Sequence, residues 1–204
     1  MRNATQTIIC FFSLFLAISS FSQKLPEWDP VFPASNLDTF QIYPGMKTGA
    51  INLLPFFSGD PSSFCGEFES PQGNQVRILP VAKLDMDTIH KMRAYVVQRK
   101  ESGYELYMIW LFDLSKGKCK ESIEITAKKV IPSTAEFHGN AWICDFDNDG
   151  LKDIFLVNET IDYEYPTESA PNISGTESYL ILLKKDSLVW TTQPSIYEHL
   201  TLKK

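Results

Sequence analysis

A short acidic loop between two apolar runs restricts the fold of this chain more than any other part of its sequence. Residues 145–153 read DFDNDGLKD, preceded by AWIC at 141–144 and followed by IFLV at 154–157. Both flanks are short, apolar and rich in residues that favour β-strands. The loop is therefore predicted to join two strands, and β-structure is the first expectation for the surrounding chain.

The same loop has the spacing of a metal site built from oxygen ligands. Its aspartates stand at positions 1, 3, 5 and 9, and Gly150 at position 6 permits a sharp turn. Calcium takes about six to eight oxygens, and alternate residues of a tight loop can direct carboxylates at one centre. The predicted ligands are the side chains of Asp145, Asp147, Asp149 and Asp153 and the backbone carbonyl of Leu151 at position 7. The alternative is a solvated acidic turn that binds no metal.

The flanks of the loop distinguish between families of calcium-binding proteins. An EF-hand or dockerin loop takes a carboxylate from position 12 and opens onto a helix, whereas position 12 here is Leu156. The stretch FHGNAWICDFDNDGLKDIFLV instead resembles the FG-GAP or VCBS-type repeat of calcium-bearing β-propeller blades in integrin-like and bacterial surface proteins. The match extends over about 137–192. In that family the aspartates of D-x-D-x-D-G-x-x-D bind calcium between the first two strands of a blade, which implies the same ligands here.

A second copy of this unit begins 60 residues earlier in the chain. Residues 82–98, AKLDMDTIHKMRAYVVQ, align without a gap on 142–158 when Asp85 is matched to Asp145. The later parts agree too, because the apolar run at 104–112 takes the place of 179–183. The chain therefore contains one good copy and one degenerate copy of the repeat.

The degenerate copy has lost the residues that a calcium loop needs. The replacements are Ile89 for the third aspartate, His90 for the glycine and Arg93 for the last aspartate. We expect this copy to bind no calcium and the Arg93 guanidinium to stand in for the cation beside Asp85 and Asp87. In the alternative interpretation, 88–100 forms an amphipathic helix with Asp87 as its N-cap.

These units predict a mainly β fold of antiparallel, four-stranded, blade-like β-meanders. Two units cannot close a propeller, which needs at least about four blades. The alternatives are a propeller-like pairing with another chain and a compact two-sheet domain, and roughly 180 residues suffice for one core. We expect a single domain over 23–204 with three parts: a proline- and aromatic-rich extended segment at 23–73, the degenerate repeat at 74–130 and the calcium-binding repeat at 137–192.

The first 22 residues predict export from the cell. Arg2 is their only charge, an apolar run covers 8–21, and small residues precede Gln23. Residues 1–22 are therefore interpreted as a signal peptide, which places the protein in the periplasm or outside a bacterial cell. The whole chain has a net charge of −6, and the mature chain keeps 18 basic against 25 acidic residues. This balance argues against nucleic acid as a partner, and no later run is long enough for a membrane span.

The mature chain keeps three cysteines, so it can form at most one internal disulfide. Cys144 precedes the acidic loop in an apolar context, and we expect it to be buried as a small hydrophobic side chain. By elimination, Cys65 and Cys119 are the favoured pair. Metal ligation or a catalytic thiol is the alternative, although the chain has no C-x-x-C pair.

A long connection in the second unit is the candidate for ligand binding. Residues 161–178 occupy a place where the first unit has only 99–103, and long loops in compact domains are often functional. Tyrosine rings interleaved with carboxylates suit a sugar, so the candidate ligand-binding residues are Asp162, Tyr163, Glu164 and Tyr165. A mobile surface loop is the alternative.

The sequence as a whole favours a secreted, non-enzymatic calcium-binding β module. No common catalytic motif is present, and the three histidines are scattered. The expected partner is an unidentified protein or glycan, with assembly among other surface proteins as a further option. A small hydrolase acting on glycan or peptide is the enzymatic alternative, and it would use paired carboxylates from Glu67, Glu69, Asp162 and Glu164.

Overall fold

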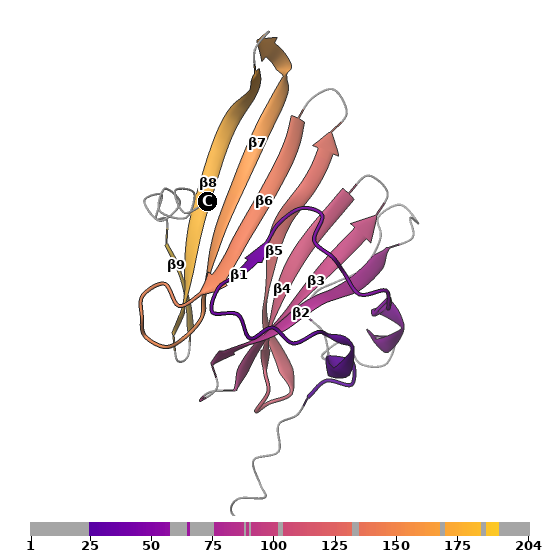
Figure 1. Ribbon diagram of the computed structural model, residues 1–204, viewed down its shortest axis with the longest axis vertical. Coiled ribbons are helices and arrows are strands. Elements are labelled where there is room, and N and C mark those ends of the chain that lie inside the picture. The colour runs from indigo at the N-terminus through magenta and orange to yellow at the C-terminus, as the bar shows by residue number, and fades with distance from the viewer. Residues whose placement is uncertain are drawn as a thin grey trace, which may run out of the picture.

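We describe the fold from a computed structural model of the chain (Figure 1). The described residues are 25–57, 65, 76–87, 89, 91–101, 104–131, 135–167, 170–184 and 187–191. The predicted signal peptide, 1–22, lies outside them. No helix in this part of the chain has the length and apolar character that crossing a membrane requires.

Strands make up most of the described chain. Two short 3-10 helices, η1 (Asp29–Val31) and η2 (Leu54–Phe57), lie in the N-terminal segment, which we define as residues 25–57. The strands are β1 (Phe40–Ile42), β2 (Arg77–Asp87), β3 (Met92–Glu101), β4 (Tyr104–Asp113), β5 (Lys118–Ile131), β6 (Ala135–Cys144), β7 (Asp153–Thr167), β8 (Ala170–Lys184) and β9 (Ser187–Thr191).

The eight strands from β2 to β9 pair with their neighbours in chain order, and every pairing is antiparallel. Figure 1 shows them side by side, from β2 to β9. We call β2–β5 unit one and β6–β9 unit two. Each unit is a four-stranded meander, so the predicted fold class is confirmed.

The helix considered for 88–100 is wrong, because β3 occupies most of this stretch and pairs with both β2 and β4. Its central residues Tyr95, Val96 and Val97 are all fully buried, on both faces of the strand. An amphipathic helix buries only one stripe. A run of β-branched and aromatic residues covered on both sides is typical of a central strand.

The two units face each other across one apolar core. Only a short hydrogen-bonded pairing joins the two units, because β5 pairs with β6 only over 128–131. Through this pairing all nine strands are connected by hydrogen bonds. The largest buried cluster takes Val96 and Ile109 from unit one, Ile143 and Leu156 from unit two, and Phe40 from β1, which pairs with β6. The chain therefore forms a compact two-sheet arrangement rather than a propeller.

The N-terminal segment covers the outer face of unit one. Trp28 and Phe32 are buried against Tyr95, with Trp28 ring contacts at 4.7 Å to Tyr95 and 5.8 Å to Trp110. The segment also bonds the edge of β2 through its backbone, where Gly49 N–H donates to the Pro80 carbonyl at 2.7 Å. The aromatic residues of this segment thus complete a second core on unit one.

The outer face of unit two carries a smaller cluster. Phe155, Val157 and Leu180 are buried there, and Trp142 and Phe146 pack beside them. At the end of this unit, Val189 and Trp190 in β9 are about half exposed.

The long loop expected at 161–178 is wrong, because β7 and β8 continue through most of it as a paired hairpin. Their register runs out to Thr167 opposite Ala170, with irregularities near Ile161 and Asp162. Figure 1 shows the ends of these strands extending beyond their neighbours. Alternate β-branched and aromatic residues, from Ile161 onward, favour this extension of the strands.

A disulfide joins Cys65 to Cys119, with Cα atoms 5.4 Å apart. This is the pairing that elimination favours, and it ties a segment outside the strands to β5. Cys144 keeps its thiol and is half-buried, whereas we expected a buried side chain. The reason is its place at the last position of β6, where the sheet ends.

Candidate metal centre

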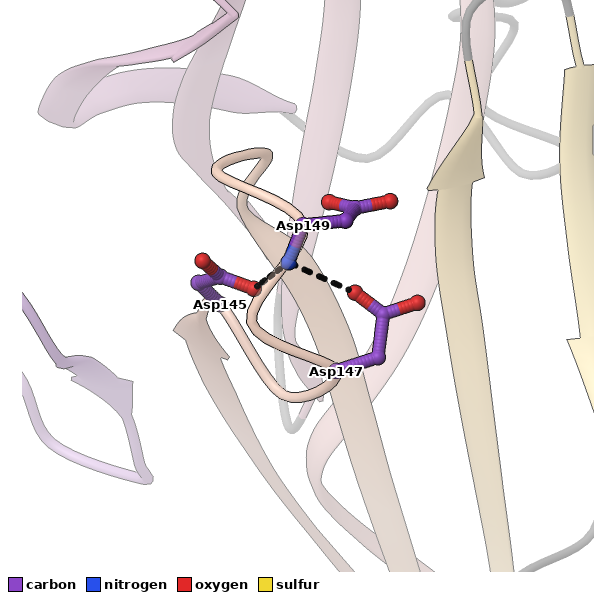
Figure 2. Close-up of side chains that lie close together, drawn as sticks. All are labelled: Asp145, Asp147 and Asp149. Atoms are coloured by element: carbon purple, nitrogen blue, oxygen red, sulfur yellow. Dashed lines mark hydrogen bonds between the residues drawn. The ribbon is translucent and has the colours of Figure 1, made fainter.

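Three of the predicted ligands converge in the loop between β6 and β7. Asp145, Asp147 and Asp149 each offer a carboxylate oxygen, and these atoms lie within 4.8 Å of one another near the surface. Figure 2 shows the Asp149 N–H between the carboxylates of the other two, to which it donates at 3.1 Å and 3.3 Å. The Gly150 N–H donates to Asp145 at 2.9 Å. Backbone hydrogen bonds therefore position the carboxylates.

Two residues in left-handed backbone conformation shape this loop. Asn148 has φ of 59° and Gly150 has φ of 86°. Asparagine and glycine adopt this region more readily than other residues. A Cβ atom added at Gly150 would meet nothing within 4 Å, so backbone conformation rather than space requires the glycine. The N–D–G sequence is thus the local reason why the chain turns here.

A lysine from β8 offsets part of the negative charge of the loop. Lys184 donates from Nζ to Oδ2 of Asp149 at 2.6 Å and also to Oδ2 of Asp147. The hydrogen bond from Lys184 is the main reason why the pKa of Asp149 is below its usual value. The same contacts, first that with Asp147, raise the pKa of Lys184. A cation that stands between two carboxylates indicates that this donor set fits a positively charged ion.

Asp153, the fourth predicted side-chain ligand, lies outside this cluster. It is fully buried at the start of β7. Its Oδ2 accepts the Phe146 N–H at 3.0 Å, and its Oδ1 accepts the Leu183 N–H at 2.8 Å. Burial raises its pKa in spite of these bonds. Asp153 therefore fixes the two ends of the loop to β8, while the Leu151 carbonyl remains a prediction.

The loop also contacts unit one and the N-terminal segment. The Lys152 N–H donates to the Met86 carbonyl at 3.0 Å, near the end of β2. The Lys152 ammonium donates to the Leu37 carbonyl at 2.6 Å. Because Lys152 belongs to the loop, these contacts with unit one and the N-terminal segment depend on an ordered loop.

Ion pairs between residues of the chain lie beside the corresponding turn in unit one. Arg93 pairs with Asp85 at 2.7 Å, as expected from the sequence, and also with Asp29 of the N-terminal segment at 2.9 Å. Asp87 is buried and accepts the Ile89 N–H at 2.8 Å. Sequence reasoning missed Asp29, because no local pattern connects it with a residue 64 positions away.

The strand register corrects the alignment of the two units by one residue. In unit one Asp85 lies opposite Arg93, whereas in unit two Cys144 lies opposite Asp153. The pairing of β2 with β3 shifts between Pro80 and Ala82, which adds one residue to β2. Asp85 is thus the structural counterpart of Cys144, and the gap-free match to Asp145 is wrong. The extra residue in β2 is offset by a turn that is one residue shorter than the loop of unit two. The two units therefore show no difference in length that a sequence alignment would detect.

The candidate ligand-binding residues lie in the extended hairpin. Asp162, Tyr163, Glu164 and Tyr165 belong to β7, and their side chains are outside the described part of the structure, as are Glu67 and Glu69. The glycan-binding role and the paired-carboxylate hydrolase therefore stay predictions.

No family model, curated protein or solved structure matches the chain. The geometry itself supports a cluster of three aspartates that can hold a metal ion.

Proposed function

We propose that the protein is a secreted, non-enzymatic β-repeat module that binds one structural calcium ion through Asp145, Asp147 and Asp149. The observation that carries this proposal is the convergence of three carboxylates within 4.8 Å, with the Lys184 ammonium against two of them. The FG-GAP or VCBS-type resemblance of the surrounding stretch supports the same assignment. Export through the predicted signal peptide to the periplasm or the cell exterior is part of the proposal.

Calcium suits this donor set better than other common ions. The three side chains supply only hard carboxylate oxygens, with no histidine or cysteine among them, and these are the ligands of calcium and magnesium rather than of zinc or copper. Magnesium requires a nearly ideal octahedron, whereas calcium accepts irregular geometry and more ligands. Because the loop lies near the surface, water molecules can fill the remaining ligand positions of the ion.

The role of the ion is to order the loop and what it touches. The loop connects β6 to β7, and Lys152 links it to unit one and to the N-terminal segment. An ion that binds only the folded state adds about 2.7 kcal/mol at one hundred times its dissociation constant. An ordered scaffold of this kind would present its surface to a protein or glycan, including other surface proteins.

The test is the thermal midpoint of residues 23–204 in millimolar calcium and in excess chelator, for the wild type and Asp149→Ala. We expect calcium to raise the wild-type midpoint by about 5–10 °C, given about 2–4 °C for each kcal/mol in a chain of this size. Asp149→Ala should lose that rise, because it removes one ligand.

The matched control is Asp38→Ala, which removes an exposed aspartate from the N-terminal segment. It should keep the full calcium-dependent rise. Equal midpoints in calcium and chelator for the wild type would contradict the proposal, and so would an equal rise in Asp149→Ala.

A further inference from the structure

We propose that Lys184 is a built-in counter-cation of the loop, which competes with calcium for Asp147 and Asp149 and so sets the calcium concentration at which the site fills. The inference rests on the proposed function and concerns how that site is regulated. It starts from the contacts of Lys184 with Asp147 and Asp149, which lie 37 and 35 positions earlier in the chain.

The geometry makes the two cations exclusive. The Lys184 ammonium bonds Oδ2 of Asp149 at 2.6 Å and Oδ2 of Asp147. Calcium–oxygen distances are about 2.3–2.6 Å, so an ion on the same two oxygens would lie against the ammonium. Two positive charges at such separation repel strongly. Lys184 must therefore leave these oxygens before the ion can take them.

The Lys184 ammonium also reduces repulsion within the loop. Three carboxylates whose oxygens lie within 4.8 Å repel one another. Lys184 offsets part of this charge, and the hydrogen bonds from the Asp149 and Gly150 N–H groups to Asp145 hold the remaining carboxylate. An ion that takes the oxygens of Asp147 and Asp149 therefore has to displace Lys184.

Lys184 is placed so that it can be released. Its side chain is 37% exposed at the end of β8, and a flexible four-carbon stem carries the charge. In unit one the ion pairs beside the corresponding turn are more enclosed, because Arg93 is only 15% exposed and bonds both Asp85 and the buried Asp29. One unit therefore carries a permanent internal cation and the other an exchangeable one.

The experiment is a calcium titration by calorimetry on wild type, Lys184→Met and Lys184→Arg. Because two exposed ion pairs are removed, we expect Lys184→Met to bind calcium about three- to tenfold more tightly. The Arg variant should stay close to the wild type, since it keeps the charge. In chelator, Lys184→Met should have a slightly lower thermal midpoint, because its carboxylates are no longer neutralised.

The matched control is Lys116→Met, which removes the same charge from a lysine paired with Asp113 in unit one. Its calcium affinity should equal that of the wild type, and an equal gain there would overturn the inference by assigning the effect to net charge. Unchanged or weaker binding by Lys184→Met would also overturn it, while leaving the proposed calcium site intact. If neither the wild type nor any variant binds calcium, the proposed function fails and the inference fails with it. Lys184→Gln serves the same comparison if the Met variant does not fold.

Discussion

The turn between β2 and β3 and the loop between β6 and β7 occupy the same place in the two units, yet they balance charge in different ways. In unit one, Arg93 lies against Asp85 and Asp29, and Lys83 bonds Asp29 from the neighbouring strand at 2.6 Å. In unit two, the Lys184 ammonium pairs with two of three aspartates that lie near the surface, Asp147 and Asp149. In unit one, basic side chains of the protein pair with the acidic ones, whereas the loop of unit two retains an excess of negative charge.

This difference follows from what covers each turn. The N-terminal segment lies over unit one and brings Asp29, which is 5% exposed, against three donors: Lys83, Arg93 and Tyr95. A buried charge is tolerated only when it is paired and hydrogen-bonded. Unit two leaves its acidic loop in contact with solvent, where an ion can enter and leave. Two similar four-stranded meanders therefore differ in their turns according to what covers them: one has a buried ion-pair cluster and the other a solvent-facing acidic loop.

The largest expected effect comes from removing the anchor in unit one. Asp29→Ala leaves the Lys83 and Arg93 charges without their shared partner and should lower the free energy of unfolding by about 3 kcal/mol. Urea denaturation measures this loss. Asp38→Ala on the same segment is the control and should change stability by less than about 0.5 kcal/mol. Equal effects of the two substitutions would mean that Asp29 does not hold the segment.

Acid should weaken the same anchor. Burial by itself would raise the pKa of Asp29, but hydrogen bonds from Lys83, Tyr95 and Arg93 outweigh it and hold that pKa below its usual value. The contribution of Asp29 is therefore complete above about pH 4, the unfolded value, and is lost as the pH falls through the lower folded value. The difference in unfolding free energy between wild type and Asp29→Asn should accordingly narrow from pH 7 to pH 3.

In unit two, the pKa of Asp153 is shifted in the opposite direction, so its effect on stability has the opposite dependence on pH. The pKa of Asp153 is raised by burial, so the folded state takes up its proton first and gains stability as the pH falls through that raised value. Asp153→Asn should remove this gain. A constant difference across the pH range for both substitutions would show that neither carboxylate titrates as proposed.

The smallest expected effect concerns the backbone of the acidic loop. Gly150→Ala forces a side chain into the left-handed region at φ of 86° and should cost about 1 kcal/mol in chelator. Gly175→Ala in β8 meets no atom within 4 Å and has no such backbone, so it should cost nothing. Denaturant midpoints measured side by side test this prediction. Equal costs would mean that the loop does not need its left-handed residue.

Local pattern accounted for most of the β-structure and for the clustering of three of the four side chains predicted as ligands. Period-two alternation, apolar runs and the D-x-D-x-D-G spacing act over a few residues, which is the range that a sequence displays directly. The same reasoning failed at 161–178, where a length difference indicated a loop but the residues favour strands. It also did not predict the hydrogen bonds of Asp153, because its partners, the Phe146 and Leu183 amides, are brought together only by the pairing of β7 with β8.

By itself, the sequence determined that this chain is built from antiparallel strands and that its carboxylates gather in one loop. Both properties depend on alternation and spacing within short stretches. Only the tertiary structure decided that the units face each other and that the N-terminal segment covers unit one. It also decided that Lys184 and Asp29 meet charges far along the chain. Those outcomes depend on burial of apolar faces and pairing of charges between distant segments, which no local pattern records.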